Sequence, residues 1–318
     1  MSINLPSPAS PLKIGTRGSP LALAQAYETR RRLMEAFDLP EAAFEVIVVH
    51  TTGDDSVLIA ADRPLKEIGN KGLFTKEIEE QMLAGQIDIA VHSSKDLPVE
   101  QPEGLVVDCF LPRENTADAF VSLKYKSLAE LPEGAVVGSS SLRRRAQLLA
   151  RRPDLNVVDF RGNVQTRLKK LGDGVADATF LAMAGLNRMN MTNVPATAIA
   201  PEDMLPAVAQ GAIGIERRVD DATTAHMLAA IHHGETGLRL AAERAFLARL
   251  DGSCQTPIAA LATIEGETLR LRGEILRPDG SQSFTDDVTG AIEDGEDIGR
   301  AMAEKLLADA GPGFFDHL

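Results

Sequence analysis

Short apolar segments alternate with segments of helical periodicity in the N-terminal third of the chain. Residues 12–14 and 44–50 carry the apolar, partly β-branched side chains of strands, and the apolar run 87–92 predicts a third, fully buried strand. Between these strands, apolar residues recur at helical spacing over 23–37 and again over 73–84. This order of elements is typical of a doubly wound α/β sheet.

The same alternation returns in the middle of the chain. Strands are predicted over 136–137, 156–160 and 179–183, and helices over 142–150 and 164–171. We interpret this segment as a second doubly wound unit.

A further domain is expected to begin near His233. It contains a loop with Cys254, a strand over 269–276 and an amphipathic helix over 296–308. The proline-rich stretch 195–206 is interpreted as a crossing between units. The whole pattern predicts an α/β protein with two doubly wound units and a smaller C-terminal domain.

Length and composition narrow the class of protein. A chain of 318 residues is too long to favour one small core, so two or three domains are expected. The net charge of −13 argues against a general nucleic-acid binder, because phosphate contacts need a basic face. No apolar run reaches the roughly 18 residues that cross a bilayer, and the first residues lack the pattern of a secretory signal. With two cysteines, which allow one disulfide at most, we expect a cytoplasmic protein without membrane partners.

Charge is unevenly distributed along the chain. Residues 138–170 contain nine Lys or Arg and two acids, whereas residues 279–318 contain ten acids and two bases. A basic tract in an acidic protein suits a cleft for a small anion. A solvated helix face beside an acidic surface would give the same distribution, so charge alone leaves both interpretations open.

A turn of small residues links the first strand of the second unit to a basic helix. Serine hydroxyls and open backbone N–H groups at a helix N-terminus favour an anion, and arginines one residue further can fork onto carboxylates. The residues concerned are Ser139, Ser140, Ser141, Arg143 and Arg144. The alternative is a serine N-cap before a solvent-facing basic helix. We favour anion binding, because capping alone does not call for so many serines and arginines together.

Two more junctions between a strand and a helix carry arginine. Arg161, Gly162 and Asn163 follow a strand of the second unit and open the helix that bears Arg167. Arg17 lies in the turn after the first strand of the chain. Ligands of open α/β sheets bind at the carboxyl ends of the strands, so these junctions predict a ligand with several carboxylates. No glycine-rich nucleotide motif occurs in the sequence.

The segment His-Ser-Ser-Lys-Asp over 92–96 ends a buried strand of the first unit. Lys95 and Asp96 could form a surface ion pair, but their position at the carboxyl end of a strand favours a site. Lys71 lies in a loop between two glycines, of the kind that covers ligands.

The two cysteines differ in their surroundings. Cys254 lies in the turn-like segment DGSCQTP and is either incidental or a nucleophile, whereas Cys109 lies in an apolar strand-like run. Neither cysteine belongs to a zinc pattern, and the six histidines show no ligand spacing with them. We therefore expect no metal site.

Taken together, eight segments of the chain resemble the porphobilinogen deaminase family. They are KIGTRGSPLALAQA (13–26), KGLFTKEIE (71–79), DIAVHSSKDLPV (88–99), FVS (120–122), GSSSLRRRAQL (138–148), RGNVQTRLKKL (161–171), LPAVAQGAIGIE (205–216) and ERAFLARLDGSCQTPIA (243–259). The segments follow one another in family order, and several are long and chemically unusual. The last forty residues match more loosely.

The resemblance implies a transferase of tetrapyrrole biosynthesis. It implies that four porphobilinogen molecules condense head to tail into hydroxymethylbilane with release of ammonia, on a dipyrromethane primer joined to Cys254 through a thioether. Asp96 would be the catalytic carboxylate. The product would pass to a downstream cyclising synthase, and the enzyme is expected to be a monomer without a metal.

The resemblance also implies a set of cofactor- and substrate-binding residues. They are Arg17, Gln25, Lys71, Ser93, Lys95, Ser139, Ser140, Ser141, Arg143, Arg144, Arg161, Gly162, Asn163, Arg167, Arg188 and Gln210. The implied fold has two domains that resemble periplasmic binding proteins and a small α+β domain. Their expected boundaries are 1–111 with 212–229, 117–205, and 233–318.

Four positions depart from the family pattern: Glu67, Ser94, Ala209 and Ser253. Glu67 puts one ligand contact in question, and the last two replace glycine, which tolerates backbone angles that other residues do not. Two rival functions remain at this point. A two-domain binding protein for a polycarboxylate would need neither Asp96 nor a loop thiol, and a cysteine acyl transferase would need a histidine near Cys254.

Overall fold

The computed structural model describes residues 4–51, 75–250 and 256–315, which form two compact units. The first unit contains the described residues of 4–114 together with 212–237. The second contains 115–211 and the described residues from 238 onward. The chain therefore leaves the first unit after Glu114, returns to it at Ala212 and leaves it again after Gly237. Lys71, Glu67, Ser253 and Cys254 lie outside the described residues.

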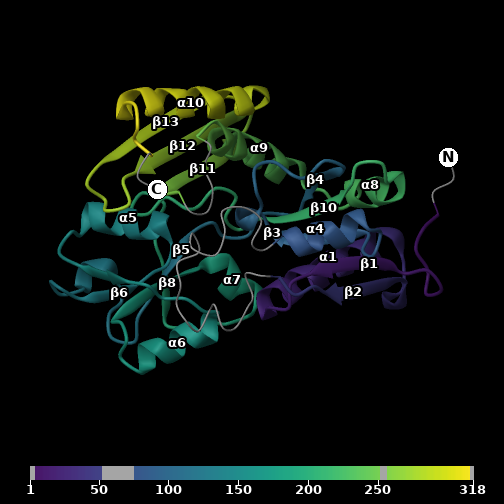
Figure 1. Ribbon diagram of the computed structural model, residues 1–318, viewed down its shortest axis with the longest axis horizontal. Coiled ribbons are helices and arrows are strands. Elements are labelled where there is room, and N and C mark those ends of the chain that lie inside the picture. The colour runs from purple at the N-terminus through teal and green to yellow at the C-terminus, as the bar shows by residue number, and fades with distance from the viewer. Residues whose placement is uncertain (1–3, 52–74, 251–255, 316–318) are drawn as a thin grey trace. The chain divides into compact units, whose positions relative to one another are not determined.

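The first unit is built on a five-stranded sheet of order β2-β1-β3-β10-β4 (Figure 1). Its strands are β1 (Leu12–Thr16), β2 (Phe44–Val48), β3 (Ile89–Ser93), β4 (Leu105–Phe110) and β10 (Ile213–Arg218). Its helices are α1 (Pro20–Phe37), α4 (Lys76–Leu83) and α8 (Ala222–Ala229). Strand β1 pairs in parallel with β2 and β3, whereas β10 runs antiparallel to both β3 and β4.

Successive residues of β3 point to opposite faces of this sheet. Ile89 joins a core cluster with Leu33 of α1, and Ala90 joins a different cluster with Ile78 of α4. His92 follows Ala90 by two residues and therefore lies on the face that α4 covers.

The second unit contains a sheet with the same arrangement of strand directions, in the order β7-β6-β8-β5-β9, but here the antiparallel strand β5 comes first in the chain. Its strands are β5 (Asp118–Val121), β6 (Val136–Gly138), β7 (Asn156–Val158), β8 (Ala178–Ala182) and β9 (Ala196–Ala198), and its helices are α5 (Leu142–Arg151), α6 (Val164–Gly172) and α7 (Met183–Arg188). Here β6 is parallel to β7 and β8, and β5 is antiparallel to β8 and β9. The stretch 195–206 contains the edge strand β9, so its interpretation as a crossing between units is wrong.

The second unit also holds a three-stranded antiparallel sheet of order β11-β12-β13. Its strands are β11 (Ile258–Glu265), β12 (Thr268–Leu276) and β13 (Ser283–Ala291), with helices α9 (Gly234–Arg249) and α10 (Gly295–Ala310). In Figure 1, α10 lies along β13 and β12. A side chain on Gly273 would meet both Phe246 of α9 and Met302 of α10, so both helices cover one face of this sheet.

Three-residue 3₁₀ helices complete the described elements. They lie at Glu41–Ala43, Ser94–Asp96, Leu128–Glu130 and Ile292–Asp294. No helix in the described ranges is long and apolar enough to cross a membrane. The α/β class with a smaller C-terminal sheet is confirmed, and the boundaries of the three expected domains stay a prediction.

Candidate active site

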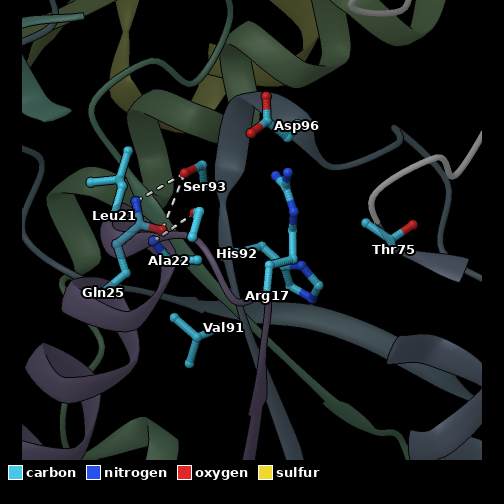
Figure 2. A pocket seen from close by; sticks show the side chains of 10 residues that line it. Arg17, Leu21, Ala22, Gln25, Thr75, Val91, His92, Ser93 and Asp96 are labelled. Carbon is cyan, nitrogen blue, oxygen red and sulfur yellow. Dashed lines mark hydrogen bonds between the residues drawn. The ribbon is translucent and has the colours of Figure 1, made fainter. Parts of the chain in front are cut away.

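A pocket opens at the carboxyl ends of β1 and β3 in the first unit (Figure 2). Ten residues line it: Arg17, Ser19, Leu21, Ala22, Gln25, Thr75, Val91, His92, Ser93 and Asp96. Four of the predicted site residues, Arg17, Gln25, Ser93 and Asp96, are therefore brought together. They come from segments up to about eighty residues apart in the sequence.

Asp96 is held in place by a short turn after β3. Residues Ser94–Asp96 form a 3₁₀ helix, and the N–H of Ser94 donates to the carbonyl of Ala212 at 3.0 Å. Just before this turn, the amide of buried Gln25 on α1 donates to Ser93 Oγ at 2.9 Å. The turn is thus tied to β10 on one side and to α1 on the other. Lys95 lies half-buried within it.

Arg17 reaches the pocket from the turn between β1 and α1. The helix starts directly after Ser19, whose hydroxyl accepts the N–H of Ala22 at 3.2 Å, and Pro20 fits the first helical position. In Figure 2 the guanidinium end of Arg17 extends toward the end of the pocket where the Asp96 carboxylate lies. The pocket therefore contains one cationic and one anionic side chain that come from different strands.

His92 lies at the base of the pocket and is almost fully buried. Its Nε2 lies 3.1 Å from Oε2 of Glu216, a buried carboxylate on β10. Glu79 of α4 is buried beside this pair, and burial raises the pKa of its carboxyl group. The first unit thus buries two carboxyl groups and one imidazole behind the pocket.

In the second unit, the serines after β6 accept backbone N–H groups. Ser141 caps α5 by accepting the N–H of Arg144 at 3.4 Å, and Ser140 Oγ accepts the N–H of Phe160 at 2.8 Å. Ser139 Oγ accepts the N–H of Ser141 at 3.3 Å. Each hydroxyl keeps its own hydrogen as a donor, so the turn retains the chemistry that suits an anion.

Arg143 and Arg144 bind a carboxylate of the chain itself. Arg143 contacts Asp118 through Nη1 and Nη2 at 2.7 and 3.2 Å, and Arg144 does so through Nη2 and Nε at 2.7 and 3.0 Å. Gln210 donates to the same carboxylate at 3.0 Å. Burial alone would raise the pKa of Asp118, but Arg143 and Arg144 lower it well below its ordinary range.

This cluster changes how the basic helix is understood. A solvent-facing basic helix was the alternative to anion binding, but Arg143 and Arg144 are 4 and 7 % exposed. The solvent-facing alternative is therefore wrong for these two residues. Their proposed contact with bound carboxylates stays a prediction, because Asp118 occupies several of their donors.

Three of the predicted arginines of the second unit contact backbone carbonyls. Arg144 and Arg167 both donate to the carbonyl of Phe180 on β8 at 3.1 Å, and Arg188 donates to that of Gly211 at 2.9 Å. Arg161 is buried, Gly162 has a φ of 117°, and Asn163 caps α6 by accepting the N–H of Thr166 at 2.9 Å. The described arginines thus gather at one edge of the sheet and outnumber its buried carboxylate, Asp118.

Cys109, the cysteine that lies within the described residues, is unsuited to nucleophilic chemistry. Cys109 is buried in β4, its Sγ lies 3.4 Å from the carbonyl of Leu228, and burial raises the pKa of its thiol to about 12. Among the described residues, no group of three His, Cys, Asp or Glu side chains is placed to hold a metal ion.

Sequence reasoning did not single out Glu79, Glu216 or Asp118. Glu216 and Asp118 are acidic residues within otherwise apolar runs, in the segments AIGIE and ADAFV. A carboxyl group at a core position is seldom left buried without a partner. That pattern is the signal that could have identified these two, whereas Glu79 lies among other charged residues in KEIEEQML and has no such signal.

Comparison with solved structures finds distant likenesses. The BvgS periplasmic VFT2 domain of Bordetella pertussis is 15% identical, with a TM-score of 0.39 over 69% of this chain and 86% of that domain. A putative methionine-binding lipoprotein of Bacillus subtilis is 12% identical, with a TM-score of 0.42 over 72% of this chain and 93% of that protein.

Sequence comparison covers nearly the whole chain. Residues 12–226 match the family described as porphobilinogen deaminase, dipyromethane cofactor binding domain, and residues 238–308 match porphobilinogen deaminase, C-terminal domain. A porphobilinogen deaminase of Paracoccus denitrificans is 64% identical over 312 residues, which is 98% of either chain. With its buried arginines and its carboxylate-bearing pocket in the matched region, the chain belongs to the porphobilinogen deaminase family.

Proposed function

We propose that Asp96 is the catalytic carboxylate of this enzyme, which condenses four porphobilinogen molecules head to tail into hydroxymethylbilane and releases ammonia at each step. One observation carries the assignment. Asp96 lies at the carboxyl end of β3, in a pocket that it shares with Arg17, Gln25 and Ser93. Active-site groups collect at this edge of open α/β sheets.

A carboxylate suits the charge that develops in this reaction. Loss of ammonia from porphobilinogen leaves a cationic azafulvene, and a fixed negative charge nearby stabilises it. The same carboxylate can exchange protons with the departing amine and with the pyrrole nitrogens. Each pyrrole also carries an acetate and a propionate, for which Arg17 in the same pocket is a suitable partner.

The second unit has the donor set that a dipyrromethane cofactor needs. Two linked pyrroles carry four carboxylates, and this sheet buries Arg143, Arg144 and Arg161 with a single carboxylate, Asp118, which the first two contact. The residues that would hold the cofactor and the growing chain are Ser139, Ser140, Ser141, Arg143, Arg144, Arg161, Gly162, Asn163, Arg167, Arg188 and Gln210. When bound, the cofactor supplies the primer onto which pyrroles are added. The side chains of the unit bind and orient its carboxylates.

The attachment point of the cofactor is proposed to be Cys254. The chain has two cysteines, and Cys109 is buried with a thiol pKa near 12. A thioether forms from an accessible thiol, which leaves Cys254 as the candidate. Lys71 and Lys95 are proposed as further ligand contacts.

Intact-protein mass tests the attachment. The purified chain is expected to carry the added mass of two linked pyrroles, in the Cys109→Ser variant as well as in the wild type. Cys254→Ser is expected to lack the added mass, even after incubation with porphobilinogen. Loss of the adduct in Cys109→Ser alone would overturn the assignment.

A rival function, binding of a polycarboxylate without turnover, is tested by ammonia release. The enzyme should release ammonia in proportion to the porphobilinogen consumed, whereas a binding protein would release none. We further propose a monomeric, cytoplasmic enzyme without a metal, whose linear product passes to a cyclising synthase. Gel filtration and activity after dialysis against a chelator check the first and third of these statements.

A further inference from the structure

Three titratable side chains are buried together behind the pocket, on the face of the first sheet that α4 covers. His92 of β3, Glu216 of β10 and Glu79 of α4 are 5, 0 and 7 % exposed. Glu216 lies opposite Ala90 in the ladder, so it is the diagonal neighbour of His92 on the same face. Its Oε2 lies 3.1 Å from Nε2 of His92.

Two oxygens of this cluster have no donor. Oε1 of Glu216 and Oε1 of Glu79 are buried and lack a hydrogen-bond partner among the residues that the structure describes. Buried polar atoms are nearly always hydrogen-bonded, and neighbouring buried carboxyl groups avoid being ionised together. A single proton on Glu79 would give Glu216 a hydrogen-bond donor, because a carboxylic acid can donate to a carboxylate. It would also leave only one of the two carboxyl groups ionised.

The electrostatic surroundings of Glu79 favour the protonated form. Burial raises the pKa of its carboxyl group most, and the charge of Glu216 raises it further. Thr75 and His92 act in the opposite direction, and Glu77 on the same helix adds to the rise. Arg218 of β10 instead donates to the carbonyls of Met82 on α4 at 3.0 Å and of Ile87 at 2.7 Å, and it pairs with Asp88 and Asp221.

We propose that Glu79 carries a proton in the native protein and donates it to Glu216, and that this acid–carboxylate pair positions His92 and the turn that bears Asp96. An ionised Glu216 only accepts, so the Nε2 of His92 must carry a hydrogen. The pair therefore fixes the tautomer and the ring orientation of a residue that lines the pocket. The inference rests on the proposed role of Asp96.

The position of His92 in the chain explains why its orientation matters. It is followed by Ser93, which binds Gln25, and then by the turn Ser94–Asp96. Movement of the ring would shift the end of β3 and with it the Asp96 carboxylate. Small misplacements of a catalytic group lower rates strongly, on the order of 10²-fold for a shift near 1 Å.

Infrared difference spectroscopy of the full-length holoenzyme tests the proton directly. The spectrum of wild type minus Glu79→Gln should contain the carbonyl stretch of a protonated carboxyl group near neutral pH. Glu80→Gln, an exposed neighbour on the same helix, should leave that band in place. Absence of the band from the wild-type protein would overturn the proposal, whatever the variants do.

Turnover provides the second readout, because the two glutamates should respond differently. An amide at position 79 can still donate to Glu216, so Glu79→Gln should keep the fold and lose little activity. Glu216→Gln removes the acceptor and should lower kcat on the order of 10²-fold, with a smaller change in KM. Equal losses in both variants, or a larger loss in Glu79→Gln, would contradict the assigned donor and acceptor.

The pH dependence of stability gives a third readout that does not involve catalysis. A carboxyl group with a raised pKa in the folded state stabilises the fold at low pH, and this contribution is lost as the pH rises through that raised pKa. As the pH rises from the ordinary pKa of a glutamate to the raised pKa of Glu79, the wild type should therefore lose stability relative to Glu79→Gln. Parallel curves would contradict the proposal. Because neither spectrum nor stability involves turnover, failure here is distinct from failure of Asp96→Asn, which tests the proposed function.

Discussion

The two five-stranded sheets share one arrangement of strand directions but bury opposite charge. In each, two parallel neighbours flank one strand (β1 or β6), and an antiparallel strand (β10 or β5) lies next to the edge. The first sheet buries Glu79 and Glu216 with one histidine, and the second buries Arg143 and Arg144 with one aspartate. The same sheet arrangement thus has acidic side chains buried against one sheet and basic side chains buried against the other.

This difference matches the two demands of the reaction. The first unit carries the pocket with Asp96, where we propose that positive charge develops, and the five-stranded sheet of the second unit carries donors suited to carboxylates. Charge is therefore arranged by side chains placed on a repeated framework rather than by the framework itself. The fold alone would not have revealed the function.

The largest effect on activity is expected from Asp96→Asn, which removes the proposed catalytic charge from the pocket of the first unit. Turnover of porphobilinogen should fall by about 10² to 10⁴-fold, because the variant loses both charge stabilisation and proton transfer. Thermal unfolding should be nearly unchanged. Glu100→Gln, an exposed acid on the same unit, serves as the control. Substantial activity in Asp96→Asn would remove the basis of the assignment.

The next largest effect is expected on stability, at the buried arginine cluster of the second unit. Asp118→Asn leaves Arg143 and Arg144 buried without a full counter-charge and should cost about 3–5 kcal/mol of stability, measured by urea unfolding. The exposed pair Lys169–Asp173 on α6 gives a matched control, since Asp173→Asn should cost less than about 0.5 kcal/mol. Similar costs in the two variants would show that burial of the cluster does not matter.

Acid titration sharpens the same point. The pKa of Asp118 is lower in the folded chain than in the unfolded chain, so its contribution is present above the unfolded value and is lost as the pH falls below it. Wild-type stability should therefore decline in acid more steeply than that of Asp118→Asn. Chemical denaturation at a series of pH values would reveal the difference, and identical slopes would contradict it.

A smaller loss of stability is expected in either unit when the cap of a helix is removed. Ser19 and Ser141 cap the helices that follow the equivalent strands β1 and β6. Changing either to Ala should cost about 1 kcal/mol. If only Ser141→Ala also weakens cofactor loading, measured by intact mass, then the cap of the basic unit contacts the cofactor as well. An equal loss of loading in both variants would argue against a special role.

The smallest expected effect is a gain in stability, at Ala209. Ala209 has a φ of 59°, in the region that favours glycine, and its N–H is held by Glu243 at 2.7 Å. Ala209→Gly should relieve strain and raise stability by about 0.5–1 kcal/mol, the excess over the entropy that glycine loses. Ala207→Gly, at a residue without a positive φ, should not be stabilising. A loss in Ala209→Gly would show that the angle is not strained.

The hydrophobic pattern of the sequence predicted the helices and strands that depend mainly on local sequence. The strands and helices of both βαβ series lie where periodicity placed them, within a few residues. Strand β10 was missed, because its place between β3 and β4 depends on pairing with residues more than a hundred positions earlier. Strand β5 shows the same limit, since it pairs with β8 across an intervening βαβ unit.

Site residues divide in the same way. Arg17, Gln25, Ser93 and Asp96 were predicted from their motifs, and the structure places them in one pocket. For Arg143 the sequence predicted a carboxylate partner but not that Asp118, 25 positions away, would provide one. Side-chain chemistry indicates what kind of partner a residue needs, whereas the topology decides which partner it meets.

The late return of the chain into the first sheet has a consequence for biosynthesis. On the ribosome, β3 and β4 emerge about a hundred residues before β10, the strand that joins them. At ordinary rates of translation this delay is roughly 5 to 20 s. The strands of the second sheet, by contrast, follow one another from Asp118 to Ala198 without interruption. The sheet that is begun first is therefore completed after the second one, and during that interval it exposes two strand edges to chaperones or to neighbouring chains.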